Sequence, residues 1–316
     1  MAKVKDFEPK GVIPATLLAL HADYTIDEKA SRKHLADCAL VDGVAAVTVN
    51  GHASEIHACT FDEQKRILDF SLDEVGDSVP LINGVYADGS HEAQRIARMS
   101  DEAGASCLLV FPPQSLAMGG VTRPESVIRH FEMIAEVTDL PIIAFRYPQG
   151  SNLAYDFDTL LELFTKVPSV RAIKDWSNDP KLHELHIRTF QSLDRPVNVL
   201  TTHSAWLMAS LTMGADGVLS GAGSVIADLQ VALFRAVQNK NLAEAQRIND
   251  RIFPLAQAFY ADPFVDMHNR MKECLVMLGR LDEAHMRPPL MKLPQNELDR
   301  LRRVLVEAGL LTKEAA

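Results

Sequence analysis

Short β-like runs alternate with helix-length segments over the first two thirds of the chain. Each run is bounded by turn residues and is followed by a pattern with helical periodicity. Eight such units in a row predict an α/β fold, a (β/α)8 barrel, because parallel strands joined through helices can close into a barrel. The predicted strands are Val12–Leu20, Ala45–Val49, Pro80–Gly84, Ser106–Phe111, Ile142–Tyr147, Val170–Lys174, Val197–Leu200 and Gly217–Ser220.

Glycines mark the ends of several predicted helices. Gly43, Gly104 and Gly214 each follow a helical pattern and precede a strand, and glycine accepts the left-handed conformation that ends a helix. After the eighth strand we expect a (β/α)8 barrel over residues 1–240 to give way to a C-terminal helical appendage over residues 241–316. The helical patterns there are Val225–Asn239, Leu242–Tyr260, Pro263–Leu278 and Asn296–Ala308, of which one can be the eighth barrel helix.

A doubly wound parallel sheet is the alternative arrangement of strands that alternate with helices. It would normally carry a glycine-rich phosphate-binding loop after an early strand. The Gly119-Gly120 pair is isolated, and Gly221 and Gly223 lack the third glycine of such a loop. The glycine pattern therefore favours the barrel.

Composition and charge narrow the classes of protein. Hydrophobic residues make up 47% of the 316 residues and charged residues 23%, as in soluble globular proteins. No apolar run reaches the ~18 residues that span a bilayer, and the N-terminal segment mixes both signs of charge, unlike a secretory signal. The net charge of −10 opposes contact with phosphate backbones and anionic membranes. We expect a cytoplasmic protein without nucleic-acid or membrane partners.

The four cysteines predict neither a metal site nor a disulfide framework. They are scattered along the chain and form no Cys-x-x-Cys pair. We therefore expect reduced, mostly buried thiols at Cys38, Cys59, Cys107 and Cys274.

The sixth predicted strand ends in a lysine that follows apolar residues. Alternation of side chains puts Ala172 and Lys174 on one face and Ile173 and Asp175 on the other. In a barrel the active site lies at the carboxyl ends of the strands. If Lys174 faces the lumen, desolvation lowers its pKa and leaves more of the neutral amine, which can form a Schiff base with a ketone. The alternative is an ordinary lysine at a strand end.

The loop after the second predicted strand is the other candidate. Residues 50–55 read Asn-Gly-His-Ala-Ser-Glu. A glycine turn at the mouth of a barrel leaves backbone N–H groups free, and these groups can bind a substrate carboxylate. The alternative is a tight loop before a helix, in which the serine is a cap.

The order of these motifs resembles the dihydrodipicolinate synthase/N-acetylneuraminate lyase family of class I aldolases and lyases. The resemblance covers the chain from Gly11 to Leu310 and makes it a divergent member. The motifs that carry it are Gly-Val-Ile-Pro-Ala at 11–15, residues 50–55, Gly84, Pro112-Pro113, Pro148, Ile-Lys-Asp at 173–175, Ser220-Gly221 and Arg-Pro-Pro-Leu at 287–290.

The resemblance implies a homo-oligomer, a dimer or tetramer, that works on pyruvate or another 2-keto acid without a metal ion or an organic cofactor. It implies that Lys174 forms the imine with the keto acid. It also implies that the loop after the second strand holds the carboxylate, with Gly51, Ala53 and Ser54 as contacts.

Several positions depart from the family pattern. His52 and Ala53 replace the hydroxyl pair that binds the carboxylate, and Phe145 replaces the tyrosine of the Tyr-Asn-x-Pro motif. His52 could act as a donor or general base, or it could be a histidine on a partly exposed loop. Tyr147 lies two residues beyond Phe145 on the same strand face, so it could supply the phenol. Otherwise Tyr147 is an amphipathic side chain at the barrel rim.

The family's tyrosine pair after the fourth strand is also replaced, by Gln114 and Ser115. One tyrosine of that pair normally crosses a dimer interface and takes part in a three-part proton relay. The relay is therefore largely absent here, which argues against dihydrodipicolinate synthase activity itself.

Further polar residues follow other strands. His203 after strand seven, and Ser220 and Gly221 at the end of strand eight, could line the pocket. The alternatives are a helix start capped at Ser204 and glycines that permit close packing. Arg146 suits a carboxylate, but alternation points it away from the lumen and favours a structural ion pair.

These observations predict a class I lyase in which Lys174 forms the imine and His52 or Tyr147 moves protons. An aldolase would make or break a C–C bond between pyruvate and an aldehyde. A dehydratase of 2-keto-3-deoxy sugar acids would use the same imine and keep the carbon skeleton. A non-catalytic, keto-acid-binding regulatory barrel is the third alternative, because three expected hydroxyls are missing. Turnover that depends on Lys174 distinguishes the two enzymes from the regulatory barrel.

Overall fold

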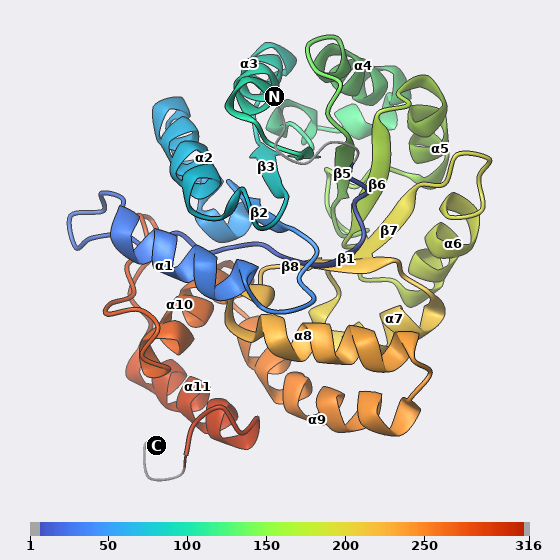
Figure 1. The fold of residues 1–316 in the computed structure, drawn as a ribbon. Coiled ribbons are helices and arrows are strands. Elements are labelled where there is room, and N and C mark those ends of the chain that lie inside the picture. Colours follow the sequence, from blue (N-terminus) through green and yellow to red (C-terminus); the bar gives the residue numbers. More distant parts are fainter. Residues whose placement is uncertain (1–6, 313–316) are drawn as a thin grey trace.

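Eight parallel strands form one sheet that curls into a barrel (Figure 1). They are β1 (Gly11–Pro14), β2 (Val47–Val49), β3 (Leu81–Val85), β4 (Cys107–Val110), β5 (Ile142–Arg146), β6 (Val170–Asp175), β7 (Asn198–Thr201) and β8 (Gly217–Ser220). The computed structural model describes residues 7–312. The strand order is β1-β8-β7-β6-β5-β4-β3-β2, and a bridge from Ala15 to Thr48 joins the two ends of the sheet. The predicted (β/α)8 barrel is confirmed.

Helices follow the strands and form the outer layer. They are α1 (Glu28–Ala39), α2 (Phe61–Val75), α3 (Ser90–Ala103), α4 (Pro124–Ala135), α5 (Phe157–Lys166), α6 (Pro180–Phe190), α7 (Leu207–Met213) and α8 (Gly223–Gln238). Thr60 and Glu63 form a capping box at the start of α2. Gly104 and Gly214 end α3 and α7 with left-handed φ angles of 106° and 110°. Gly43 also has a positive φ, 100°, but it lies in the loop beyond α1.

The predicted strands match the observed ones to within one or two residues at each end, except the first. The predicted strand Val12–Leu20 is too long, because β1 ends at Pro14. Apart from the single bridge of Ala15 to Thr48, the apolar residues that follow are buried outside the sheet; the N–H of Leu17, for example, donates to the hydroxyl of Ser224 at 3.1 Å. The residues from Leu17 to Leu20 are therefore apolar because they are buried in a loop, and not because they pair with a neighbouring strand.

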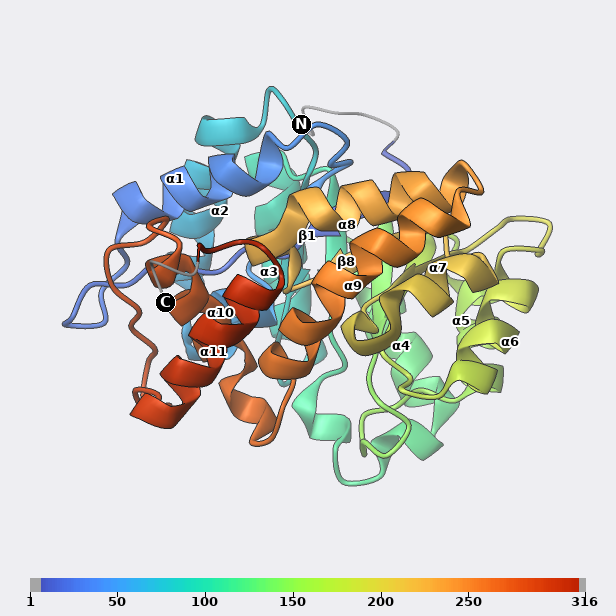
Figure 2. The ribbon, with the colours of Figure 1, turned by 90° about the horizontal axis from the view of Figure 1, so that it is seen from below.

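Three further helices follow the barrel, namely α9 (Leu242–Phe259), α10 (Met267–Met277) and α11 (Gln295–Glu307). Figure 2 shows α9 lying beside α8, against which it packs. The predicted helix over Pro263–Leu278 begins instead with a 3₁₀ turn, Phe264–Asp266, which precedes α10. The division of the chain at residue 240 stays a prediction.

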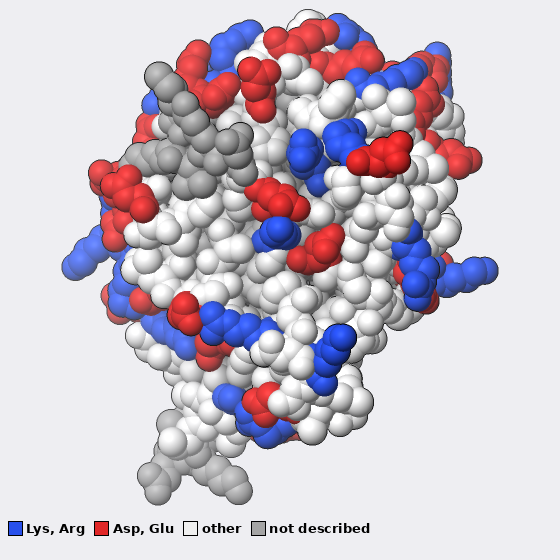
Figure 3. Space-filling model, turned by 45° about the vertical axis from the view of Figure 1, so that its right-hand side comes forward, with Lys and Arg blue, Asp and Glu red and all other residues white. Residues whose placement is uncertain are grey.

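Acidic and basic side chains are mixed over the surface shown in Figure 3. Several opposite charges pair along a helix, such as Lys65 with Asp69 and Lys166 with Glu162, both at 2.6 Å. Such exposed pairs contribute little to stability individually. Within residues 7–312, none of the helices has the length and apolar character needed to cross a membrane.

Candidate active site

A cavity opens at the carboxyl ends of the strands, where a barrel places its active site. Its walls come from the loop after β2, the ends of β4, β5 and β6, the loops after β7, β8 and α9, and the start of α10. The lining residues are Ala15, Gly51, His52, Ala53, Leu109, Phe145, Lys174, Trp176, Thr202, Gly221, Tyr260, Met267 and His268.

Lys174 projects into this cavity from the end of β6. The strand register pairs it with Phe145 on β5 and Leu200 on β7, and its Nζ lies 4.3 Å from the centre of the Phe145 ring. The side chain is buried, and within the described chain its amine forms neither a hydrogen bond nor an ion pair. Burial therefore lowers the pKa of Lys174 from 10.5 to about 7. Near neutral pH a large share of this amine is uncharged and nucleophilic.

The loop after β2 is fixed at Asn50, whose φ of 52° turns the chain sharply. The side-chain amide of Asn50 donates to the carbonyl of Gln64 and to Oδ1 of Asn83, both at 2.8 Å. A Cβ on Gly84 would lie 1.8 Å from the carbonyl oxygen of Asn50. Glycine is therefore required in β3 for the loop to pack against the strand.

The next residues of this loop have unoccupied backbone donors. In the described part of the chain, the N–H groups of Gly51, His52 and Ala53 have no acceptor. All three residues line the cavity. Ser54 lies outside the lining, and its donors are occupied. Its N–H donates to the carbonyl of Gly51, and its hydroxyl donates to the carbonyl of Thr16 at 2.7 Å. The unoccupied donors are suited to an anionic group of a ligand.

The structure brings together His52, from the loop after β2, and Tyr147, from the loop after β5. The Tyr147 hydroxyl lies 2.8 Å from Nε2 of His52, and the Tyr147 ring stacks on Phe145 at 4.8 Å. Burial, together with the nearby charge of Lys174, holds the pKa of His52 well below its usual value. Burial raises the pKa of Tyr147. Both groups are therefore neutral, and the hydroxyl and Nε2 share one hydrogen bond, whose direction follows from the tautomer of the imidazole.

A buried ion pair ties the β2 loop to the C-terminal helices. Oε1 of Glu55 lies 2.5 Å from Nζ of Lys272, and Oε2 accepts the backbone N–H of Arg287 at 2.9 Å. Lys272 also donates to the carbonyl of His285 at 2.6 Å. The loop that carries His52 is thus held in place from outside the barrel.

Besides Ser54, the predicted contact residues His203 and Ser220 lie outside the cavity lining, as does the predicted catalytic residue Tyr147. Nε2 of His203 accepts the backbone N–H of Asn178 at 3.1 Å, and the ring is buried. The Ser220 hydroxyl is hydrogen-bonded to that of Ser204 at 2.9 Å. Gly221, the neighbour of Ser220, does line the cavity. His203 and Ser220 support the wall, while Gly221 forms part of it.

Arg146 is buried and turned away from the cavity. Its guanidinium donates to the carbonyl of Tyr147 at 2.8 Å and to the side-chain oxygen of Gln149. Its partners are thus neutral oxygens and not the carboxylate of the expected ion pair. Burial lowers the pKa of Arg146.

Asp175 lies on the opposite face of β6 from Lys174. Its Oδ2 accepts from Nδ1 of His183 at 2.8 Å and from Nδ1 of His186 at 2.7 Å, and its Oδ1 accepts from the N–H of Ser177 at 2.8 Å. Burial opposes ionisation of this carboxyl, but the two histidine hydrogen bonds outweigh it and hold the pKa well below its usual value.

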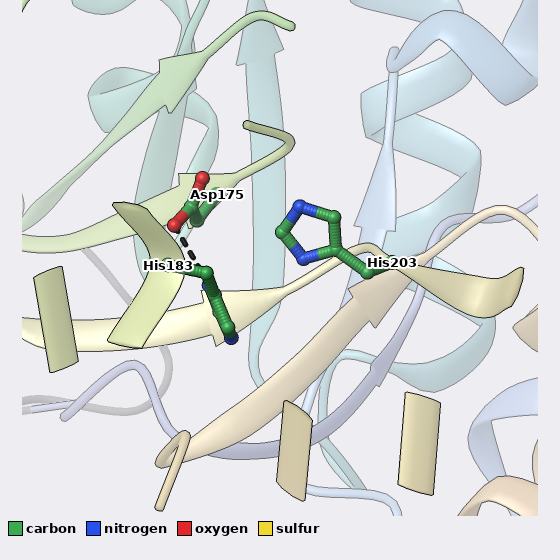
Figure 4. A group of neighbouring side chains, drawn as sticks. All are labelled: Asp175, His183 and His203. Atoms are coloured by element: carbon green, nitrogen blue, oxygen red, sulfur yellow. Dashed lines mark hydrogen bonds and ion pairs between the residues drawn. The ribbon is translucent and has the colours of Figure 1, made fainter. Parts of the chain in front are cut away.

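Asp175, His183 and His203 lie close enough together to be considered as metal ligands (Figure 4). Nε2 of His183 is hydrogen-bonded to the Ser210 hydroxyl at 2.7 Å, and Nδ1 of His203 to the Thr201 hydroxyl at 3.1 Å. The ligand atoms are thus already engaged with protein groups. This donor set fits a hydrogen-bonded network better than a metal site.

Seven lining residues were not predicted as site residues from the sequence: Ala15, Leu109, Trp176, Thr202, Tyr260, Met267 and His268. Trp176 directly follows β6, so extension of the strand-end search by one residue would have found it. Tyr260 and His268 belong to the C-terminal helical region, whose packing on the barrel has no signal in the local pattern. Burial, with a smaller effect of Lys174, lowers the pKa of His268 to about 3, so its imidazole is neutral.

Comparisons with known proteins agree with the barrel fold and also identify the family. The model of the dihydrodipicolinate synthetase family matches residues 8–308. A 4-hydroxy-tetrahydrodipicolinate synthase of Haloarcula marismortui is 30% identical over 302 residues, covering 93% of this chain and 92% of that protein. The probable 2-dehydro-3-deoxy-D-pentonate aldolase YjhH of Escherichia coli is 23% identical, covering 95% and 98%.

Among solved structures, YagE of Escherichia coli in complex with pyruvate is similar, with a TM-score of 0.88 at 23% identity, covering 96% of this chain and 99% of that one. At this identity the structural match shows a shared fold. The family match, by contrast, extends over nearly the whole chain. The chain therefore belongs to the dihydrodipicolinate synthetase family and is an enzyme of its Schiff-base-forming lyase and aldolase class.

Proposed function

We propose that this protein is an aldolase that forms an imine between Lys174 and pyruvate or another 2-keto acid. The observation that carries the proposal is the buried amine of Lys174, which has no hydrogen-bond or ion-pair partner among residues 7–312 and whose pKa of about 7 makes it a nucleophile at neutral pH. Two similar proteins support it, since YjhH is a probable aldolase and YagE was solved with pyruvate.

The keto acid would enter with its carboxylate toward the β2 loop. The unoccupied N–H groups of Gly51, His52 and Ala53 are the donors for that carboxylate. Ser54 holds the loop through its bond to Thr16 and does not itself contact the ligand.

The reaction then uses Lys174 and the His52–Tyr147 pair. The amine attacks the keto carbon and water leaves, which gives an iminium ion that withdraws electrons from the neighbouring carbon. Loss of a proton from that carbon gives an enamine, and the enamine attacks an aldehyde. The Tyr147 hydroxyl, 2.8 Å from His52, exchanges the protons, and hydrolysis of the imine restores Lys174.

Dihydrodipicolinate synthase activity itself is disfavoured, although the matched relatives include such synthases. Phe145 stands where that enzyme's tyrosine is expected, and Gln114 and Ser115 are exposed in a 3₁₀ turn after β4. The hydrogen-bonded pair of His52 and Tyr147 offers a different proton route.

The partner expected for this enzyme is a small-molecule 2-keto acid, and its expected assembly is a homo-oligomer. The four cysteines are free thiols, as suits a reducing compartment, which supports a cytoplasmic location. The dehydratase alternative uses the same imine, because the Tyr147 phenol could protonate a leaving hydroxyl as well as an aldehyde oxygen.

Borohydride trapping tests the proposal. The protein is incubated with pyruvate, or with 2-keto-3-deoxy acids, and borohydride, and intact mass and peptide mapping locate any reduced adduct. We expect a pyruvate adduct on Lys174 that is lost in Lys174→Ala and kept in Lys181→Ala, which removes an exposed lysine. Absence of an adduct on folded protein, or an adduct on another lysine, contradicts the proposal. Adducts with the sugar acids alone would favour the dehydratase.

A further inference from the structure

Glu55 lies in the middle of the β2 loop, directly after the residues with unoccupied N–H groups. It joins two 3₁₀ turns, His52–Ser54 and Ile56–Ala58, and its φ of 55° is left-handed, which is uncommon for a residue with a side chain. Its own N–H donates to the carbonyl of His52 at 3.0 Å. In the described chain the turn thus uses the carbonyl of His52 and leaves the N–H of that residue for a ligand.

The carboxylate of Glu55 fixes this turn through two partners from the C-terminal region. Oε1 lies 2.5 Å from Nζ of Lys272, and Oε2 accepts the backbone N–H of Arg287 at 2.9 Å. Both side chains of the ion pair are 1% exposed. Lys272 itself donates to the carbonyl of His285 at 2.6 Å. The β2 loop, α10 and the segment that precedes α11 thus meet at one buried carboxylate.

Other contacts fix the two ends of the loop. Asn50 holds its start through its side-chain amide, and the Arg287 guanidinium donates to the carbonyl of Ala58 at 2.6 Å near its end. Between these ends the Ser54 hydroxyl forms a hydrogen bond to a neutral carbonyl. Hydrogen bonds between ionised groups are stronger than neutral ones. The ion pair of Glu55 is therefore the stronger constraint on the middle of the loop.

We propose that Glu55 and Lys272 are positioning residues for the carboxylate of the keto acid. Neither lines the cavity. They act by holding the N–H groups of Gly51, His52 and Ala53 in one orientation before the ligand arrives. Donors that are already ordered bind a ligand at a lower cost in free energy than donors that must first be fixed. This inference rests on the proposed function, and it makes the C-terminal helices part of what determines the affinity for the keto acid.

The reactivity of Lys174 does not depend on this link. Lys174 lies on β6, between β5 and β7, so loss of the ion pair should weaken the binding of a carboxylate and leave the amine nucleophilic. Acetone separates the two effects, because it has the methyl group and keto carbon of pyruvate but no carboxylate. The ratio of the second-order trapping rate constants for pyruvate and acetone therefore measures what the carboxylate contributes to binding.

The test measures this ratio by borohydride trapping on Lys174 in the wild type and in Glu55→Gln. We expect the ratio to fall about tenfold in Glu55→Gln, while the rate constant for acetone stays within about twofold of the wild type. The pyruvate concentration that gives half-maximal trapping should rise by the same factor, and the maximal rate should be kept. An unchanged ratio in the folded variant overturns the inference alone. A wild type that traps acetone but not pyruvate overturns the proposed function as well.

A double variant keeps the test valid if Glu55→Gln alone does not fold. Removal of one partner leaves the other charge buried and unpaired, whereas Glu55→Gln combined with Lys272→Met removes both charges. Circular dichroism should show an intact fold, and the ratio should fall as in the single variant.

Glu297→Gln is the matched control. Glu297 also pairs with a buried cation of α10, Arg270, at 2.9 Å, but its ion pairs lie within the C-terminal helices. Its ratio should stay at the wild-type value. An equal fall in Glu297→Gln would show a general effect of C-terminal packing and would contradict the inference.

Discussion

Lys174 and Asp175 are neighbours on β6, and both side chains are buried, yet their surroundings differ. The Lys174 amine lies 4.3 Å from the centre of an aromatic ring and has no hydrogen-bond partner among the described residues. The Asp175 carboxylate accepts three hydrogen bonds from His183, His186 and Ser177. Burial leaves the lysine partly neutral and reactive, while the donors keep the aspartate ionised. Burial alone does not determine the protonation state, because the available partners decide it.

Replacement of Lys174 should have the largest effect on activity. Lys174→Ala removes the nucleophile, so turnover should fall by about a thousandfold or more. Circular dichroism should show an intact fold, and Lys181→Ala should retain activity. Comparable turnover in Lys174→Ala would mean that the amine is not the nucleophile.

Replacement of Asp175 should mainly affect stability. Asp175→Asn keeps the shape of the side chain but removes the charge. The new amide N–H₂ group would face N–H donors of His183, His186 or Ser177, with no acceptor between them. We expect the free energy of unfolding to fall by about 3 kcal/mol, because buried donors lose their acceptor. Urea denaturation measures this loss. A variant as stable as the wild type would show that the network does not support β6.

Tyr147→Phe should separate proton transfer from imine formation. Loss of the hydroxyl that contacts His52 should lower kcat by about a hundredfold, whereas pyruvate should still be trapped on Lys174. Tyr86→Phe is a matched control, because its ring also packs near His52, at 6.2 Å. Equal kcat values for the two variants would remove Tyr147 from the mechanism.

The stability of Lys174→Met should sharpen the comparison with Asp175. The pKa of Lys174 is lower in the folded state, about 7, than its ordinary value of 10.5, so between these values the unfolded chain binds more protons. The wild type therefore gains stability as the pH rises from about 7 to 10.5. Below pH 7 its stability is lowered by the full free-energy cost of burying the charged ammonium group. Lys174→Met should have the higher Tm near pH 6, and this advantage should shrink toward pH 10. A difference independent of pH would contradict the shifted pKa.

The barrel was predictable because its signals are local. Repeated apolar runs and glycines such as Gly104 and Gly214 indicated the strands and helix ends. The same alternation rule placed Lys174 and Asp175 on opposite faces of the sixth strand. It failed for Val12–Leu20, because apolar residues buried in a loop resemble a strand in composition.

Other parts of the site depend on contacts between distant segments. The pairing of His52 with Tyr147 links positions 95 residues apart, and that of Glu55 with Lys272 links positions 217 apart. Neither pair has a local signature. The Phe264 ring likewise reaches Trp176 only through the packing of the C-terminal helices on the barrel.

The central claim is that Lys174 is reactive because its amine is buried without a hydrogen-bond or ion-pair partner in the described part of the chain. The most direct test is to measure the rate of pyruvate trapping on Lys174 at a series of pH values. Samples are quenched at successive times, and intact mass gives the fraction of protein that carries the adduct. We expect the rate to rise as the amine loses its proton, with an apparent pKa near 7, and to level off above it. A rate that continues to rise toward pH 10 would show an ordinary lysine and contradict the account.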